Sequence, residues 1–205
     1  MDQSANENRA TMRKQATASL VTQLCRRFTA EHGLNGFTIE EVCTEVGISR
    51  RTFFNYFPSK EDAVLGIDET EDMARFADAF LSRKSRGWNA VVEDLVGFAI
   101  EHINSAGHNA AEHIAFMKVL EREPRLLARF IGAGREREAG LVALVAQREG
   151  VPADDPHARA AVDVVATVMR STADRISDPR VAEDFGAALT DSLAAIRAVL
   201  TPPVP

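Results

Sequence analysis

Cationic and hydrogen-bonding side chains are concentrated between residues 49 and 60 of this 205-residue chain. Arginine can bond guanine edges and phosphate oxygens, and serine, threonine, asparagine and tyrosine can bond phosphates or base edges. These residue types in so short a stretch point to recognition of double-stranded DNA. The candidate contacts within the stretch are Ser49, Arg50, Arg51, Thr52, Phe54, Asn55, Tyr56 and Lys60.

Two short helices joined by a tight turn are predicted to position these side chains. Thr38, with Glu41 three residues later, is a capping-box pattern that begins a helix at residue 39, and Gly47 ends that helix. Ser49 is a second N-cap and begins a helix over residues 50–57, which Pro58 ends. Two short helices separated by a glycine-containing turn form the helix-turn-helix pattern.

A preceding helix over residues 12–32 is expected to complete this module. Its apolar positions Ala16, Leu20, Leu24 and Phe28 recur at helical spacing, and Gly33 follows as a stop. Packing of the three helices would leave the polar face of the third helix exposed. The expected core partners of Leu24 and Phe28 are Ile39, Val42, Val46, Ile48, Phe53 and Phe57.

The distribution of charge fits DNA binding better than the net charge of −6 does. Residues 1–60 hold eight Lys and Arg against six Asp and Glu, whereas the remaining 145 hold sixteen against twenty-four. A modestly basic N-terminal module on an acidic body can still attract phosphate, because the local potential steers the encounter. The charge distribution alone does not distinguish a DNA-binding module from chance clustering of basic residues.

Residues 38–42 (TIEEV) and 47–61 (GISRRTFFNYFPSKE) resemble the TetR family of bacterial regulators. The resemblance extends over about 50 residues, from the first helix into the fourth, and the remaining residues carry no family motif. It implies an all-helical protein that binds operator DNA, commonly as a homodimer and commonly as a repressor.

The resemblance also implies roles for individual residues. Thr38 matches a phosphate contact at the N-terminus of the second helix, and Lys60 matches a phosphate-contacting lysine at the start of the fourth. In the recognition helix, the matching positions are Arg50, Arg51 and Thr52 at its opening, where base and phosphate contacts lie, and Asn55 and Tyr56 on its groove-facing side.

Two positions depart from the family pattern. Phe54 stands where the family commonly has tyrosine, which removes a phenol that would bond phosphate and leaves Tyr56 to supply one. Arg51 replaces a common glycine and adds a cation that could read guanine. Phe53 and Phe57 are expected in the core, whereas a core position and a contact with the groove wall both stay open for Phe54.

The rest of the chain is predicted to be helical, which gives an all-α protein of about nine helices. A helix-turn-helix domain over residues 1–58 would precede a larger ligand-binding and dimerisation domain over residues 59–205. Glycine and proline place a loop at residues 150–156. The helices expected after the third lie at residues 59–82, 88–105, 109–121, 124–149, 157–176 and 180–200.

A partly apolar small molecule of unknown identity is the expected effector of the larger domain, with no cofactor and no metal. Aromatic, Met and His side chains suit a mostly apolar site, and two arginines could pair with a ligand carboxylate or phosphate. The same residues could instead be ordinary core and solvated surface. His102 and His113 lack an evident third metal ligand. The pocket candidates are Trp88, Phe98, His102, His113, Phe116, Met117, Arg135, Met169 and Arg170.

The last two helices are expected to form a homodimer interface, because their apolar surface extends beyond one stripe. The resembled family pairs these helices in a four-helix interface, which presents two recognition helices to successive major grooves. Complete burial in a monomer core is the alternative. The candidate interface residues are Val165, Phe185, Ala188, Leu189, Ser192, Leu193 and Ile196.

Several other classes of protein are not expected. No nucleophile elbow, P-loop, HExxH or dinucleotide-binding glycine pattern is present, so we expect no enzyme. A signal peptide is missing, no apolar run approaches the ~18 residues of a membrane helix, and Cys25 and Cys43 form no disulfide framework, so we expect a bacterial cytoplasmic protein. The expected function is ligand-responsive repression at a palindromic operator. The alternative is an effector-independent DNA-binding or protein-interaction module whose helical body only dimerises.

Overall fold

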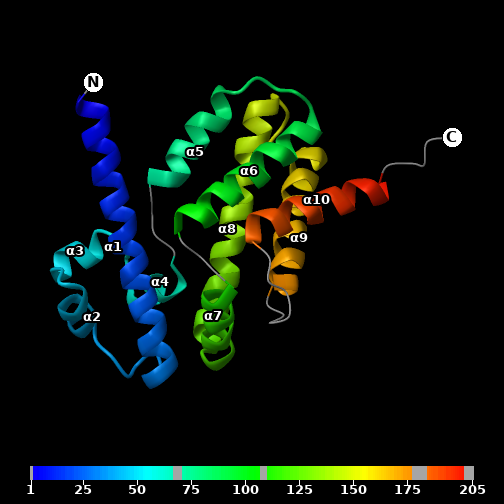
Figure 1. The fold of residues 1–205 in the computed structure, drawn as a ribbon. Coiled ribbons are helices and arrows are strands. Elements are labelled where there is room, and N and C mark those ends of the chain that lie inside the picture. The colour runs from blue at the N-terminus through cyan, green and yellow to red at the C-terminus, as the bar shows by residue number, and fades with distance from the viewer. Residues whose placement is uncertain (1, 67–70, 107–109, 177–183, 201–205) are drawn as a thin grey trace. The chain divides into compact units, whose positions relative to one another are not determined.

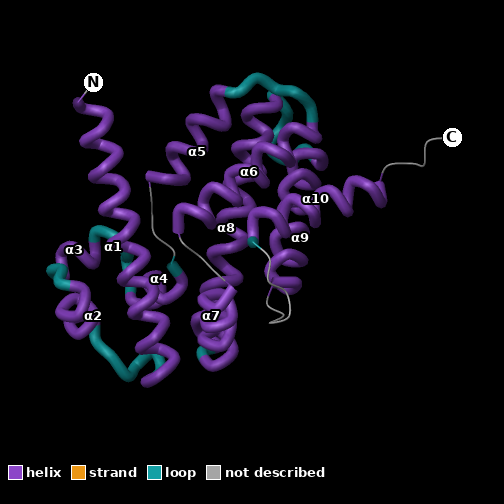
Figure 2. The backbone as a smooth tube through the Cα atoms, viewed as in Figure 1, coloured by secondary structure: helices purple, strands orange, loops and turns teal. Residues whose placement is uncertain are grey.

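The computed structural model describes residues 2–66, 71–106, 110–176 and 184–200, and all regular elements in these ranges are α-helices (Figure 1, Figure 2). The all-α prediction is therefore confirmed. The ten helices of the described ranges are α1 (Asp2–His32), α2 (Ile39–Val46), α3 (Arg50–Phe54), α4 (Lys60–Leu65), α5 (Glu71–Ser82), α6 (Trp88–Ala106), α7 (Ala110–Arg122), α8 (Pro124–Glu149), α9 (Pro156–Ile176) and α10 (Phe185–Leu200).

Local capping explains where the helices of the predicted motif begin. At α2, the Glu41 N–H donates to the Thr38 hydroxyl (3.2 Å), and the Glu41 carboxylate accepts from the Thr38 N–H (2.7 Å), so the predicted capping box is present. Ser49 and Ser59 each accept a hydrogen bond from the backbone N–H three residues later, at 3.0 and 3.1 Å. These caps satisfy N–H groups that a helix start leaves without an intrahelical partner.

Several predicted helix boundaries differ from the structure, and the first is the start of α1, which begins at Asp2 rather than at residue 12. The helix expected over residues 59–82 is divided, because Gly66 takes a left-handed conformation (φ 72°) that ends α4 at Leu65. The recognition helix ends at Phe54 rather than at residue 57, and Asn55 is its C-cap. The last helix begins at Phe185, and residues 180–183 of the prediction lie outside the described residues.

Internal contacts divide the chain into two compact units, each made of two segments. Unit 1 comprises Met1–Glu71 and Ile114–Gly134, and unit 2 comprises Asp72–His113 and Arg135–Pro205. Unit 1 therefore holds α1 to α4, most of α7 and the first part of α8. Unit 1 therefore has a different extent from the domain predicted over residues 1–58. That prediction rested on the helix-turn-helix motif alone.

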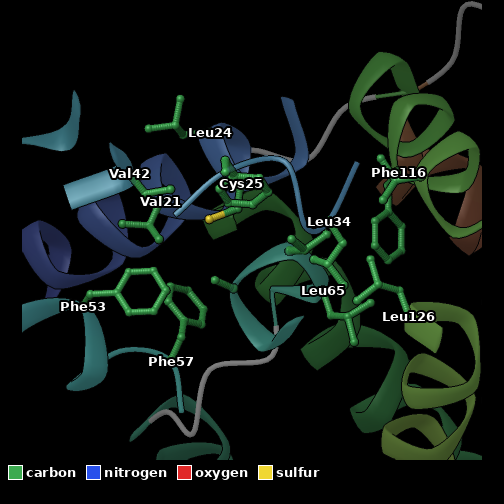
Figure 3. Packing of buried hydrophobic residues seen from close by; sticks show 14 of the residues in the cluster. Val21, Leu24, Cys25, Leu34, Val42, Phe53, Phe57, Leu65, Phe116 and Leu126 are labelled. Atoms are coloured by element: carbon green, nitrogen blue, oxygen red, sulfur yellow. The ribbon is translucent and has the colours of Figure 1, made fainter. Parts of the chain in front are cut away.

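The core of unit 1 lies between α1, α2, α3, α4 and the apolar faces of α7 and α8 (Figure 3). The predicted core residues Leu24, Val42, Phe53 and Phe57 are all buried in it. Four more predicted members, Phe28, Ile39, Val46 and Ile48, are half-buried against the same cluster. The core partners expected for Leu24 and Phe28 did not include the other large members of this cluster, which are Val21, Cys25, Leu34, Phe37, Val64, Leu65, Phe116, Val119, Leu120 and Leu126.

Two of the four predicted apolar positions of α1, Ala16 and Leu20, are exposed. Leu20 is 50% exposed, whereas its neighbour Val21 is fully buried. The helix carries enough apolar residues for two adjacent stripes, and packing of α1 against α4 selects the stripe that includes Val21 and Cys25. Burial also raises the pKa of the Cys25 thiol to about 12.

The core of unit 2 is formed by α5, α6, α9, α10 and the later part of α8. Valine and leucine side chains dominate it, and Phe80 is its largest fully buried member. Both α9 and α10 pack on α6 and on each other, so their small and apolar residues are used within the chain. None of the described helices combines the length and apolar character that a membrane crossing requires.

Candidate nucleic-acid interface

The turn between α2 and α3 sets the geometry of the predicted DNA-binding surface. Gly47 adopts φ 76° and ψ 34°, a left-handed conformation that costs glycine little, and its N–H donates to the Cys43 carbonyl (2.9 Å). Ile48 packs half-buried against the core of unit 1, and Phe53 is fully buried there. The packing of Ile48 and Phe53 against this core thereby leaves the opposite side of α3 facing outward.

All nine predicted DNA contacts lie in unit 1, and they differ in exposure. Exposure is the first requirement for contact with a duplex, and six of the nine side chains meet it fully. Thr38, Ser49, Arg50, Arg51, Phe54 and Asn55 are exposed, whereas Thr52, Tyr56 and Lys60 are half-buried. The DNA contacts themselves stay predictions.

Phe54 lies at the surface. Its side chain is 45% exposed and meets the buried Phe53 ring edge-on, with ring centroids 5.5 Å apart. Of the two positions left open for Phe54, the core position is therefore wrong. The Arg50 guanidinium lies over its ring, 5.8 Å from the centroid.

Lys60 has a structural contact that the sequence did not reveal. Its ammonium donates to the Phe37 carbonyl (2.7 Å) and lies 4.4 Å from the centroid of the Phe37 ring. Lys60 therefore ties the start of α4 to the loop before α2. An ammonium has three donors, so this contact leaves N–H groups for a phosphate.

Thr38 is likewise engaged within the chain. Besides the capping box, its hydroxyl donates to the Glu41 carboxylate (2.9 Å). These hydrogen bonds from Thr38 hold the pKa of Glu41 below its usual value. A phosphate that bonds the Thr38 hydroxyl must therefore compete with the Glu41 carboxylate.

The two arginines at the start of α3 have different surroundings. The Arg50 guanidinium donates to the Glu40 carboxylate of α2 through Nη1. Arg51 is exposed and has no hydrogen bond or ion pair within the described part of the chain. A weaker ion pair joins Arg27 of α1 to Glu45 of α2, at 3.4 Å.

A bidentate ion pair holds α4, the helix that follows the motif. Arg129 of α8 donates through Nε and Nη2 to both oxygens of Asp62, each at 2.7 Å. The Asp62 side chain is 4% exposed, and it also accepts from the Ser59 hydroxyl. At the other end of α4, Arg26 of α1 donates to the Val64 carbonyl at 2.9 Å. Sequence reasoning missed both arginines, because their partners are distant along the chain.

The predicted effector candidates fall into separate groups. In unit 2, Trp88 stacks on His157 (ring centroids 5.3 Å apart). Phe98 stacks between Phe76, at 3.7 Å, and His102, at 6.0 Å. Met169 is half-buried against the unit 2 core. Arg135 and Arg170 are exposed.

Two further effector candidates belong to unit 1. Phe116 is buried in its core, beneath the Arg26 guanidinium (4.3 Å) and beside Phe130 (ring centroids 5.4 Å apart). Met117 is 39% exposed. The side chain of His113 lies outside the described residues. Phe116 is a core residue of unit 1, which agrees with the alternative that the pocket candidates are ordinary core. The effector pocket itself stays a prediction.

Four of the seven residues predicted for the dimer interface are buried within unit 2. Ala188 and Leu189 have no exposed surface, and Leu193 and Val165 are 7% and 8% exposed. These four side chains pack inside unit 2, so they have little or no surface to offer a second copy. The half-buried candidates are Phe185, Ser192 and Ile196, and Ser192 is bonded to Thr172 of α9 at 2.9 Å.

The buried motif core, the glycine turn and the exposed cationic helix define a helix-turn-helix protein. A family model described as bacterial regulatory proteins, tetR family, matches residues 25–65, and one described as the MftR C-terminal domain matches residues 87–201. The chain belongs to the TetR family of bacterial regulatory proteins. The resemblance carried by residues 38–61 is thereby confirmed.

The chain is also similar to a curated relative and to solved structures. The HTH-type transcriptional regulator TcmR of Streptomyces glaucescens is 31% identical in an alignment of 144 residues that covers 66% of this chain. The match spans 61% of TcmR, less than two thirds of its length. The crystal structure of a transcriptional regulator, TetR family, from Agrobacterium tumefaciens aligns with 92% of this chain and 100% of that one, at 18% identity and a TM-score of 0.45.

Proposed function

We propose that this chain is a DNA-binding transcriptional regulator that acts as a ligand-responsive repressor on a palindromic operator. The observation that carries the proposal is the capped α2–Gly47–α3 arrangement, which buries Phe53 and leaves Arg50, Arg51 and Asn55 exposed. A helix held this way can enter a major groove, where its N-terminal side chains reach base edges. Membership of the TetR family supports the same assignment.

The repressor binds as a homodimer in this proposal. One α3 contacts only one half-site, and a five-residue recognition helix offers few base contacts. Two copies related by a two-fold axis would read a palindrome with half-sites about 34–36 Å apart. The exposed face of α10, which includes Val199 and Leu200 at 85% and 73% exposure, supplies apolar surface for a second copy.

The effector is proposed to be a partly apolar small molecule that binds unit 2 in a bacterial cytoplasm. The aromatic stack of Phe76, Phe98 and His102 supports a ligand of this type, because flat apolar groups pack well on such rings. To act as a switch, the ligand must bind the DNA-incompetent conformer more tightly, by roughly 5.5 kcal/mol for a nearly complete change of state.

Selection from a random duplex library tests the proposal directly. The full chain should enrich a palindromic sequence and bind it with an affinity that falls steeply as salt rises. Failure to enrich any sequence would refute a sequence-specific regulator. Partly apolar small molecules should then release the selected duplex. If none of a broad set does so, the effector-independent module is the better description.

A further inference from the structure

Arg50 is held on two sides before any DNA is present. Glu40, in the first turn of α2, accepts a hydrogen bond from Arg50 Nη1 across the turn. The Phe54 ring, one turn further along α3, lies 5.8 Å from the guanidinium carbon. The Arg50 and Glu40 side chains are 60% and 55% exposed, so the pair lies at the surface where DNA is expected.

The chemistry of a guanidinium makes this arrangement selective. Arginine reads guanine by donating two parallel hydrogen bonds to O6 and N7, which requires a fixed orientation of its planar group. The carboxylate of Glu40 is bonded to Nη1, and the remaining N–H groups of Arg50 have no other partner in the described part of the chain. A side chain already held in place also loses less rotational freedom when it binds.

The negative charge of Glu40 has a second effect. Phosphate oxygens are repelled by a carboxylate, whereas a guanine edge carries no net charge. Arg50 beside Glu40 is therefore a poorer phosphate contact than a free arginine, but remains able to bond a base. Arg51, which has no partner within the described residues, has no such restriction.

We propose that Glu40 is a positioning residue for base recognition: it orients Arg50 toward a guanine edge and disfavours its contact with the phosphate backbone. This inference rests on the proposed DNA-binding function, because it assigns a specificity determinant within the same surface. Glu40 lies on the helix before the recognition helix, and it was not among the predicted contacts.

Two other glutamates of α2 provide a contrast. Glu41 belongs to the capping box, so its replacement would weaken the helix itself. Glu45 is exposed and pairs with Arg27 of α1 at 3.4 Å. Replacing Glu45 by alanine removes the same charge from the same helix without touching Arg50, so this variant is the matched control.

The test compares Glu40→Ala, Glu40→Gln and Glu45→Ala in the full chain. Affinity is measured for the selected duplex, for its variants at each base pair and for an unrelated duplex of equal length. Glu40→Ala should weaken binding to the selected duplex by about three- to tenfold and lose the preference at one base pair. Binding to the unrelated duplex should stay the same or become tighter, since one negative charge is gone.

Further variants separate positioning from other effects. Glu40→Gln keeps an oxygen that accepts from Arg50, so it should retain part of the preference. Glu45→Ala should retain all of it. In an Arg50→Ala background, Glu40→Ala should cause no further loss of preference.

Two results would overturn the inference. If Glu40→Ala binds both duplexes more tightly with unchanged preference, Glu40 only repels DNA. If it weakens binding to both duplexes equally, its role is structural. A wild-type chain that selects no sequence would instead overturn the proposed function, and this inference with it.

Discussion

At the scale of single residues, the predicted DNA contacts differ in how far the folded chain already uses them. Thr38 is engaged in a capping box, Lys60 is bonded to the Phe37 carbonyl, and Arg50 is paired with Glu40. Arg51 has no such bond within the described residues. A cation without an internal partner can transfer its full interaction to DNA, because no existing bond has to be broken first.

Arg51→Ala should therefore cause a large loss of operator affinity. A good arginine–base contact discriminates by about 1–3 kcal/mol, so a base contact from Arg51 predicts a complex weakened by about five- to 150-fold. Fluorescence anisotropy with the selected duplex measures it. Arg137→Ala, at an exposed position in unit 2, is the control and should bind normally. An unchanged affinity for Arg51→Ala would show that our assignment of this contact is wrong.

Lys60→Ala should have two separable effects. Binding should weaken equally for all sequences, and the slope of log affinity against log salt should fall by about one, because one phosphate contact is lost. The free energy of unfolding should also fall by about 1 kcal/mol, since the bond to the Phe37 carbonyl disappears. Urea titration measures stability, with Lys118→Ala as the control. A change in sequence preference would argue against a phosphate role.

At the scale of helices, the position of a short helix depends mainly on its capping residues and on its contacts with other elements. The recognition helix α3 has only five residues, so Gly47, Ser49 and the buried Phe53 decide its position more than helix propensity does. The next helix, α4, has six residues and is held by Asp62 and Arg129. Both helices owe their placement to contacts outside themselves.

Gly47→Ala isolates the cost of the left-handed turn. A Cβ at this position would meet no atom within 4 Å, so only the backbone conformation at φ 76° opposes it. We expect a loss of about 1 kcal/mol in the free energy of unfolding, measured by urea denaturation. Gly97→Ala is the matched control, because Gly97 lies inside α6 and also has open space. It should stabilise by about 0.5–1 kcal/mol, and a loss at both positions would contradict the explanation.

Arg129→Ala tests the anchoring of α4. The variant leaves the nearly buried Asp62 carboxylate without its bidentate partner, although Arg129 is half-exposed and solvent screens the pair. We expect a loss of about 1–3 kcal/mol in the free energy of unfolding, which Asp62→Asn in the same chain should partly restore. Arg125→Ala, at an exposed position of the same helix, should change stability little. Equal effects of the two arginine variants would refute a specific anchor.

At the scale of the whole molecule, the proposed homodimer would have to hold two DNA-binding modules at a defined spacing. The buried Ala188 and Leu189 are already used within unit 2, so the proposed dimer would have to use other surface. The exposed apolar end of α10 is one such surface. In the proposed dimer, exposed side chains would therefore matter more than the buried apolar residues that the sequence suggested.

Sedimentation at micromolar concentration should therefore give a mass about twice the 22.4 kDa of one chain. The palindromic duplex should bind far more tightly than one half-site. Lengthening the spacer by five base pairs turns one half-site by about half a helical turn, and should abolish this advantage. A monomer, or equal affinity for both spacings, would contradict the dimer.

Local patterns made much of this fold predictable. The capping box at Thr38, the N-caps at Ser49 and Ser59, and the glycine turn involve residues three or four apart, so their partners can be identified in the sequence. Phe53 and Phe57 follow from the same helical spacing and are buried as predicted. The helix-turn-helix and its family could be predicted because these local signals coincide in one short stretch.

Contacts between distant segments were decided only by the tertiary structure. Asp62 and Arg129 are 67 residues apart, and Lys60 lies 23 residues from the carbonyl it bonds. The choice of Val21 over Leu20 on α1, and the burial of Ala188 and Leu189, likewise depend on which helices pack together. The sequence alone determined where the short helices of the motif begin and which stretch forms the helix-turn-helix, because hydrogen bonds within a turn depend on neighbours. Which cations remain free, and which apolar residues remain exposed, depends on partners that only the folded chain brings together.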